Sequence, residues 1–285
     1  MIVFPPTYTE DFIRCPVYAR LRKTDWHLRA ESPHPGLYIG RALSKGLAAF
    51  YEQFEQGAAG EPGAEDIARQ EAATALTWPF EDGESEWTQA GVEKLCGKAL
   101  VAALKTAREL VGSETVIGAE YRLPHSRPDL ISRDYTGALI VTDTKYSLEL
   151  DSRWRDKRIS EYDTANQFWH YAWETEEFLG EPVTWFRLHL VTGIPCKSDL
   201  FPFRVDRDRL AFWIQSTEAV WEQMAKYMVF TKTLPPQDLP LDLLPGNWQT
   251  CLTGKYGRCV YYEFCHTFHR NPDAAQVLYI QRKEG

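Results

Sequence analysis

The segment from residue 115 to residue 146 constrains the fold most, because it consists of short β-branched runs between regions of helical spacing. The runs cover residues 115–123, 128–134 and 138–146, and the turn sequence Asp-Tyr-Thr-Gly at 134–137 separates the last two. Alternating β-branched runs joined by tight turns are typical of neighbouring antiparallel strands. The sequence therefore predicts a meander of three strands.

Helical patterns lie on both sides of this meander. Before it, the spacing of apolar residues predicts helices over residues 9–23, 38–56, about 65–77 and 86–111, with a loop at 57–65. After it, the sequence predicts a basic linker (147–158), a helix (160–179), a strand (185–193), a second strand that pairs with it (200–205) and a long amphipathic helix (207–230). This order predicts an α/β fold, with a mixed β-sheet flanked by helices and further helices in front.

Length and composition fit an intracellular globular protein. The chain has 285 residues, of which 44% are hydrophobic, so it can bury a sizeable core. We expect one domain over 1–285, with a helical part at 1–112, a core at 113–232 and a tail at 233–285. No apolar run of about 18 residues occurs, so we expect no membrane span. The start lacks the basic and apolar regions of a signal peptide, and we expect a cytoplasmic location.

Acidic residues and a lysine come together at the predicted strand ends. Asp143 and Lys145 follow an apolar run, and residues two apart on a strand project from the same face. Asp129 begins the neighbouring strand, and the hairpin brings it close to them. Glu120 lies on the first strand. The other interpretation of these residues is a weak surface ion pair.

This set of residues fits phosphodiester hydrolysis. That reaction uses a hard cation such as Mg²⁺ or Mn²⁺ to polarise the phosphate and to lower the pKa of a bound water, and both ions prefer oxygen ligands. A nearby lysine can orient the water and offset developing negative charge. The net charge of −8 provides no protein-wide basic field for nucleic acid, but it suits an enzyme that gathers carboxylates around metal ions.

A helical pair follows the acidic motif, because Gln167 and Tyr171 are four residues apart and share one helix face. In this order of motifs the chain resembles the RecB-like branch of the PD-(D/E)XK nuclease superfamily. The resemblance implies a restriction-endonuclease-like core in which Asp129, Asp143 and the Thr144 carbonyl bind the catalytic Mg²⁺ or Mn²⁺. It further implies Glu120 as an additional acidic residue of the metal site and Lys145 as the catalytic lysine. Gln167 and Tyr171 would position DNA or the active-site groups.

One position departs from that branch. Its members often carry a metal-binding histidine in a Gly-x-x-x-His pattern on an early helix, and the matching segment here runs from Gly40 to Ser44. Serine therefore stands at the histidine position. This departure motivates an alternative hypothesis, in which the protein is a weakly active or inactive DNA-binding subunit of a recombination or repair complex that retains the nuclease fold.

Four of the six cysteines suggest a metal centre. Cys251, Cys259 and Cys265 lie close together near the end of the chain, and Cys15 precedes a proline near its start. Clustered cysteines in a reducing compartment suggest metal binding, and four thiolates suit a [4Fe–4S] cluster or Zn²⁺. His266 and His269 could replace a ligand in a zinc site. The alternatives are buried free cysteines and a zinc-stapled interaction protein with chance acidic motifs. We interpret Cys96 and Cys196 as ordinary residues.

The same cysteines resemble those of the iron–sulfur CRISPR-adaptation nucleases and of the AddB helicase–nuclease subunit. The final Cys-x5-Cys matches, whereas Cys251 and Cys259 are separated by seven residues where these proteins have two. The resemblance implies a structural [4Fe–4S] cluster held by Cys15, Cys251, Cys259 and Cys265, which closes the C-terminal tail on the N-terminal segment.

The expected partner is DNA, either single-stranded or at its ends, on which the protein would act as an exonuclease. A helicase or recombination protein is a further expected partner. A basic cluster in the linker could contact the DNA backbone or stack on a base; the alternative is an exposed loop. Its residues are Arg153, Trp154, Arg155, Lys157 and Arg158.

Overall fold

The computed structural model describes part of the chain and divides it into two compact units. The described residues are 3–15, 26–28, 35–55, 63–78, 87–149, 156, 159–160, 162, 165–231 and 279–281. One unit spans Ser32–Leu210, and the other combines Met1–Glu31 with Ala211–Gly285. Each unit is described by itself, and the expectation of a single domain over 1–285 stays a prediction.

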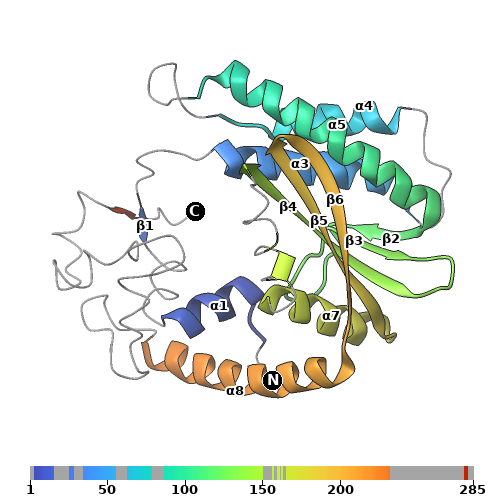
Figure 1. The fold of residues 1–285 in the computed structure, drawn as a ribbon. Coiled ribbons are helices and arrows are strands. Elements are labelled where there is room, and N and C mark those ends of the chain that lie inside the picture. The colour runs from blue at the N-terminus through green and yellow to red at the C-terminus, as the bar shows by residue number, and fades with distance from the viewer. Residues whose placement is uncertain are drawn as a thin grey trace. The chain divides into compact units, whose positions relative to one another are not determined.

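A mixed sheet of five strands forms the centre of the Ser32–Leu210 unit (Figure 1). Its strands, in spatial order, are β2 (Thr115–Ala119), β3 (Leu130–Arg133), β4 (Leu139–Glu149), β5 (Val183–Ile194) and β6 (Cys196–Arg204). Neighbours are antiparallel except β4 and β5, which are parallel. The predicted three-strand meander, the pairing of the last two strands and the α/β class are confirmed.

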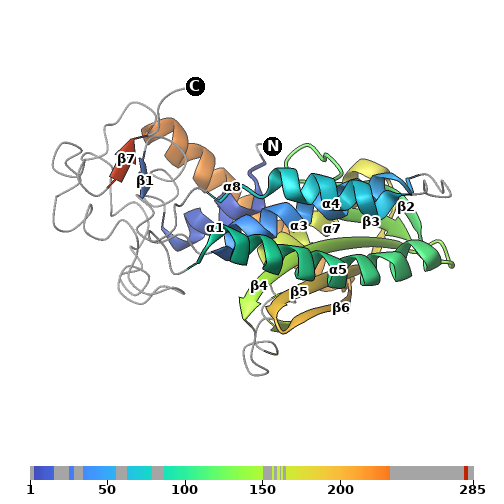
Figure 2. The ribbon, with the colours of Figure 1, turned by 90° about the horizontal axis from the view of Figure 1, so that it is seen from above.

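Helices cover both faces of this sheet. In the two ribbon views, α3 (Pro35–Glu52), α4 (Ala64–Ala75) and α5 (Gln89–Ser113) lie on one face, and α7 (Asn166–Leu179) lies on the other (Figures 1 and 2). The helix α7 is the crossover that a parallel β4–β5 pair requires. Among the described helices, none combines the length and the apolar character of a membrane-spanning segment.

The main hydrophobic core lies between the sheet and the α3–α4–α5 layer. Buried residues of α3 and α5, such as Leu43 and Leu104, pack with Leu130 and Val191 of the sheet. Helices α3 and α4 approach closely at Gly46, where an added Cβ would lie 2.8 Å from the Ala68 carbonyl oxygen. Close packing of this kind explains why a glycine stands inside a helix, where it otherwise costs about 1 kcal/mol.

Side chains of β4 alternate between the two faces. Tyr146 packs against the core under α3 and α5. On the other face, the Phe168 ring of α7 lies 4.5 Å from the ring of Phe186, which is the β5 partner of Val141. Because strand residues two apart share a face, Val141, Asp143 and Lys145 all lie on the α7 side.

Several predicted boundaries were wrong. The first helix, α1, covers Pro6–Arg14 instead of 9–23, because proline suits the first turn of a helix; residues 16–25 lie outside the described ranges. Strand β2 ends at Ala119, because Glu120 adopts a left-handed backbone with φ of 38°. Strand β4 continues to Glu149 and so takes in the start of the predicted linker.

The second unit contains α1 and most of α8 (Arg207–Thr231), whose first residues belong to the other unit. The indole N–H of Trp221 donates to the Thr9 hydroxyl at 3.0 Å. The rings of Phe12 and Tyr227 meet edge to face at 5.5 Å. Two short strands, β1 (Trp26–Leu28) and β7 (Tyr279–Gln281), pair antiparallel, so segments near the two ends of the chain are neighbours.

Candidate active site

Asp143 and Lys145 form an ion pair on the α7 side of β4. The Lys145 Nζ atom lies 2.9 Å from Asp143 Oδ1 and 2.7 Å from Oδ2. The Asp143 side chain is only 3% exposed, whereas that of Lys145 is 31% exposed. The prediction that the two residues share a strand face is therefore confirmed, and the carboxylate is buried with its lysine reaching toward solvent.

Asp129 lies opposite this pair. It immediately precedes β3, and the pairing of Leu130 with Thr142 places it across from Asp143. Its Oδ2 atom accepts a hydrogen bond from the backbone N–H of Thr144 at 2.6 Å. Burial, together with the negative charge of Asp143, raises the pKa of Asp129 to about 7. The charge of Lys145, which is paired with Asp143, opposes this rise.

The electrostatics keep Lys145 protonated. Burial opposes the charged form, but the carboxylate of Asp143, then Tyr162 and Asp129, raise the pKa of Lys145 above its ordinary value. The side chain therefore presents an ammonium group with donors beyond those used by Asp143. It can donate to an anionic oxygen and offset negative charge.

The predicted Gln167–Tyr171 pair lies on α7 and contacts the segment that leads into Asp129. Gln167 Nε2 donates to the Tyr171 hydroxyl at 2.7 Å, and that hydroxyl donates to the Arg127 carbonyl oxygen at 3.4 Å. Burial, then the charge of Asp143, raises the pKa of Tyr171, so the phenol stays neutral. The pair is thereby placed beside the carboxylates, as the sequence predicted for one helix face.

Glu120 lies next to Asp129, but cations already surround its carboxylate. Its backbone N–H donates to the Asp129 carbonyl oxygen at 2.9 Å. Its side chain accepts from Ser44 at 3.1 Å and from Lys45 at 2.7 Å, and Arg127 lies 3.4 Å away. Burial opposes ionisation, yet the hydrogen bond from Lys45 and the charge of Arg127 lower the pKa of Glu120. We call Glu120, Ser44, Lys45 and Arg127 the Glu120 corner.

Sequence reasoning missed three residues of this region. Lys45 follows Ser44 directly, and Arg127 precedes the Pro-Asp motif, but neither was predicted to contact Glu120. Glu174 on α7 accepts from the His125 backbone N–H at 2.6 Å and from the Ser126 hydroxyl. It therefore holds the loop that leads into Asp129. The available signal was spacing, because Glu174 follows Tyr171 by three residues on the same helix face.

The oxygen donors here fit a hard cation. Asp129 and Asp143 provide carboxylates whose mutual repulsion raises the pKa of Asp129, and a bound cation would relieve that repulsion. The predicted third donor, the Thr144 carbonyl, directly follows Asp143 on β4. Within the described ranges, no group of three or more His, Cys, Asp or Glu side chains is arranged to hold a metal. A cation would therefore rely on two carboxylates, backbone oxygen and water.

The other predicted sites fall mostly beyond the described part of the chain. Cys251, Cys259 and Cys265 lie outside it, as does the whole basic cluster of the linker. Cys15 is described: it is half-buried just after α1, and its N–H donates to the Asp11 carbonyl oxygen at 2.8 Å. Cys96 lies in the α5 core, where burial raises the pKa of its thiol to about 11.

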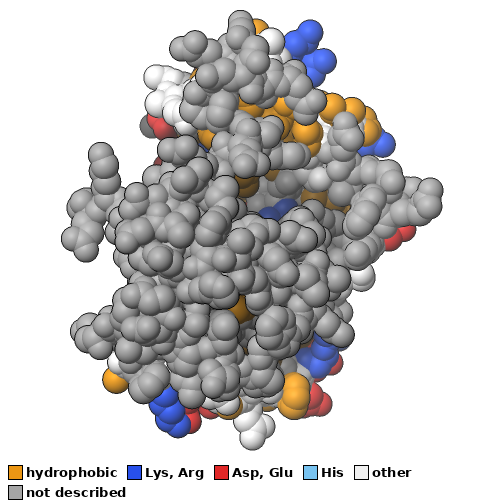
Figure 3. Space-filling view, turned by 90° about the vertical axis from the view of Figure 1, so that its left-hand side faces the viewer, with side chains coloured by type: hydrophobic (Ala, Val, Ile, Leu, Met, Phe, Trp, Pro, Cys, Tyr) orange, Lys and Arg blue, Asp and Glu red, His pale blue; other side chains and the backbone are white. Residues whose placement is uncertain are grey.

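The described cations make no single continuous patch on the face shown in Figure 3. There, the coloured Lys and Arg side chains appear as separate points, several of them beside acidic side chains. This agrees with the acidic net charge of the chain. With a net charge of −8, the field of the whole protein does not attract a polyanion, and contacts to one depend on local groups of cations.

No protein-family profile matches this sequence, and no curated protein matches it. Solved structures align with it at low similarity. One is a protein from Eubacterium rectale described as "Putative exonuclease", at 14% identity over 78% of this chain and 80% of that one, with a TM-score of 0.43. Another is SSO0001, at 13% identity over 80% and 92%, with a TM-score of 0.25. At such scores the chemistry of this chain has to be argued from its own residues.

Proposed function

We propose that this protein is a metal-dependent DNA nuclease of the PD-(D/E)XK class. The observation that carries the proposal is the convergence of Asp129, which immediately precedes β3, with Asp143 and Lys145 in the middle of the neighbouring β4. Two buried carboxylates with a single lysine leave a surplus of negative charge, which is costly without a cation. Structural ion pairs are usually balanced, so this arrangement favours a metal site.

Each residue has a distinct task in this proposal. Asp129 and Asp143, with the Thr144 carbonyl, would hold Mg²⁺ or Mn²⁺, which supplies the polarisation of the phosphate and the acidification of a water. The Lys145 ammonium donates to the attacking water or to a phosphate oxygen and offsets developing charge. Tyr171 and Gln167 fix the approach of the DNA. Lys45 and Arg127, each about half exposed, can contact neighbouring phosphates.

The test is a digestion of end-labelled DNA by the purified protein with Mg²⁺, with Mn²⁺ and with a chelator. We expect cleavage of linear single-stranded DNA only with metal. Circular single-stranded DNA should resist if the protein is an exonuclease, and labels at either end report the polarity. Failure to cut any of these substrates with either metal would overturn the proposal.

We further propose that Cys15, Cys251, Cys259 and Cys265 bind a structural [4Fe–4S] cluster, with Zn²⁺ as the alternative. The pairing of β1 with β7 supports it, because Cys15 precedes one of these strands and Cys265 the other. Quantification of iron, sulfide and zinc in protein purified without oxygen tests the proposal. About one zinc and no iron per chain would favour the zinc alternative. Neither metal would overturn both.

A second candidate function is a non-catalytic DNA-binding subunit, which could partner a helicase or recombination protein. The contact between Ser44 and Glu120 favours it, because a hydroxyl hydrogen-bonded to a carboxylate provides no imidazole ligand for a metal. Tight DNA binding without cleavage, across several divalent metals, would support this candidate. If so, Ser44→His should restore metal-dependent cleavage, whereas Ser44→Ala should not.

A further inference from the structure

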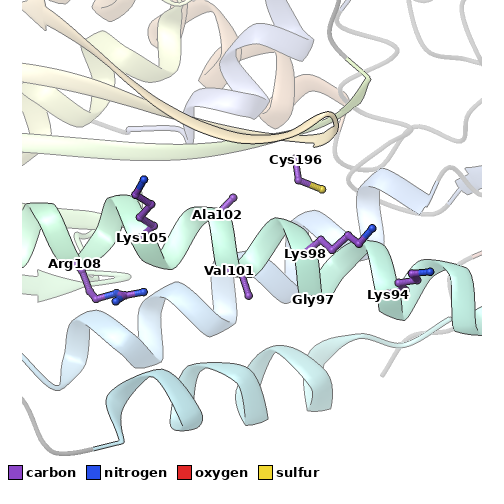
Figure 4. Close-up of a pocket in the computed structure, with 8 residues that line it drawn as sticks. All are labelled: Lys94, Gly97, Lys98, Val101, Ala102, Lys105, Arg108 and Cys196. Atoms are coloured by element: carbon purple, nitrogen blue, oxygen red, sulfur yellow. The ribbon is translucent and has the colours of Figure 1, made fainter.

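A groove runs along α5, on the face of the sheet opposite Asp143 and Lys145. It has a volume of about 670 Å³. Its lining comes from the exposed side of α5 and from the start of β6, and comprises Lys94, Gly97, Lys98, Val101, Ala102, Lys105, Arg108 and Cys196 (Figure 4). The groove is thus lined by four cations and, between them, by small or apolar residues.

The cations follow one stripe of the helix. Lys94, Lys98, Lys105 and Arg108 succeed one another at spacings of four, seven and three residues, which places them in one row along α5 with Lys105 and Arg108 at its two edges. At about 1.5 Å per residue the stripe extends over roughly 21 Å. Figure 4 shows Lys105 on the side of α5 that faces the β-hairpin carrying Cys196, and Arg108 on the side of α4.

Most of this positive charge has no ion-pair partner among the residues that the structure describes. Arg108 pairs with Glu65 of α4 at 2.8 Å, and Glu65 also pairs with Arg69. Within the described part of the chain, Lys94, Lys98 and Lys105 have no such ion pair. Three neighbouring lysines on one helix repel one another, and an anionic partner would relieve that repulsion.

The floor of the groove contains a glycine, Gly97, at a position where the helix itself would be more stable with a larger residue. Gly97 lies in the interior of α5, where glycine costs about 1 kcal/mol relative to alanine. An added Cβ at Gly97 would meet no atom within 4 Å, so packing of the fold does not require glycine there. Beside it, Val101 is 55% exposed. A small floor flanked by lysines suits a ligand that brings its backbone close to the helix.

We propose that this groove, which we call the α5 groove, binds the sugar–phosphate backbone of a nucleic acid strand. A linear row of lysines over an apolar floor suits evenly spaced phosphates with sugars or bases between them. The proposal rests on the proposed nuclease function for its choice of polyanion. Cys196 lies where β5 turns into β6, beside the C-terminal end of β4, the strand that carries Asp143 and Lys145.

The test is fluorescence anisotropy of labelled single-stranded DNA, about 30 nucleotides long, against the full-length protein at several salt concentrations with a chelator present. The variant Lys98→Gln/Lys105→Gln should weaken binding, and the slope of log affinity against log salt should decrease by roughly 1.4, the value for two phosphate contacts. The control Lys226→Gln/Arg204→Gln removes the same charge at exposed positions elsewhere, and it should keep the wild-type slope.

A second variant separates groove occupancy from charge. Gly97→Leu fills the floor with a good helix former, so it should weaken DNA binding while the melting temperature is maintained or rises. Wild-type affinity and salt slope in both groove variants would overturn the proposal. Loss of binding to poly-glutamate with unchanged DNA binding would overturn it too, since the groove would then accept an acidic protein segment.

The outcome is independent of cleavage. If the protein cuts DNA but the groove variants bind like wild type, the α5 groove proposal fails and the nuclease proposal stands. If the protein never cuts DNA but the groove variants lose affinity, the nuclease proposal fails and the groove remains a nucleic-acid surface.

Discussion

The Asp129–Asp143 pair and the Glu120 corner are neighbours with opposite charge balances. At the first, two carboxylates lie near Lys145, which pairs with Asp143. At the second, one carboxylate is shared by Lys45 and Arg127 and also accepts from Ser44. The effect on pKa differs accordingly, because it is raised to about 7 at Asp129 and lowered at Glu120. On the nuclease proposal the first would bind a further cation, whereas the carboxylate of the second already has cationic partners in the protein.

The Asp129–Asp143 pair and Glu120 therefore have different tasks, although all three are acidic residues of the same predicted motif. Surplus carboxylates suit metal binding, and a compensated carboxylate suits the joining of α3 to the loop before Asp129. Glu120 thereby positions two half-exposed cations next to the pair, where a DNA phosphate would approach. Each prediction below tests one side of this comparison.

The largest effect is expected at Lys145. Lys145→Ala should reduce metal-dependent cleavage by about 1,000-fold, since an ammonium aimed at developing charge contributes ~4 kcal/mol. Single-turnover cleavage of labelled DNA measures it, and anisotropy should show DNA binding reduced far less. A matched change at the exposed Lys226 of α8, Lys226→Ala, should leave the rate unaltered. Equal cleavage rates for wild type and Lys145→Ala would show that the Asp143–Lys145 pair takes no part in the reaction.

A fall in pH should lower the free energy of unfolding through a residue on one face of the sheet and raise it through a residue on the other face. On the face opposite Asp143, burial and then the charge of Arg187 lower the pKa of His189 to about 4 from 6.5. The folded state therefore excludes a proton that the unfolded state takes up below pH 6.5. The stability contributed by neutral His189 is fully present above that pH and is lost toward pH 4, by roughly 3 kcal/mol.

Urea unfolding of metal-free protein between pH 7.5 and 4.5 measures this effect. Differences of about 1 kcal/mol in the free energy of unfolding can be resolved this way. His189→Gln should flatten the loss of stability at low pH. Asp129→Asn should steepen it, because the folded pKa of Asp129 is raised from 3.8 and its protonation stabilises the protein as the pH falls through 7. Parallel pH profiles for wild type and His189→Gln would contradict the assignment of the acid loss to His189.

A smaller effect is expected at Lys45. Lys45→Ala should slow cleavage by about tenfold, or ~1.4 kcal/mol, because its side chain is half exposed and pairs with Glu120 before DNA arrives. The loss should appear as a raised KM rather than as a lowered kcat, if Lys45 binds phosphate equally in the ground and transition states. A loss as large as that for Lys145→Ala would show that the two sides of the comparison do not differ in task.

The smallest effect is expected at Glu120. Glu120→Gln keeps an acceptor for Ser44 but removes the charge shared by Lys45 and Arg127, both about half exposed. We expect a loss of about 1 kcal/mol in the free energy of unfolding and a cleavage rate within about threefold of wild type. Unfolding curves and initial rates measure the two quantities. A hundredfold loss of cleavage with unchanged stability would instead make Glu120 a metal ligand.

The sequence was sufficient for the part of the site that depends on local geometry. The turn at 134–137 joins two β-branched runs, and the period of two along β4 places Asp143 and Lys145 on one face. Together these relations predict the meeting of Asp129 with Asp143. The pair Gln167–Tyr171 follows from helix periodicity in the same way.

The remainder depends on contacts between residues far apart in the chain. Ser44 and Glu120 are 76 residues apart, and no local pattern predicts that they meet. The left-handed backbone of Glu120, which ends β2 early, is likewise not encoded by a glycine or asparagine that would have revealed it. The groove on α5 depends on packing against the β5–β6 hairpin and was also not predicted.

The parallel pairing of β4 with β5 has a consequence for the order in which the protein folds. The hairpin of β3 and β4 closes over a short turn, whereas β5 can join β4 only after the intervening chain, with α7, has crossed the sheet. Closure of long loops is entropically costly and slow. We therefore expect the two carboxylates to meet first in a solvated hairpin, where their repulsion is weak, and α7 to bury them only when the rest of the sheet is assembled.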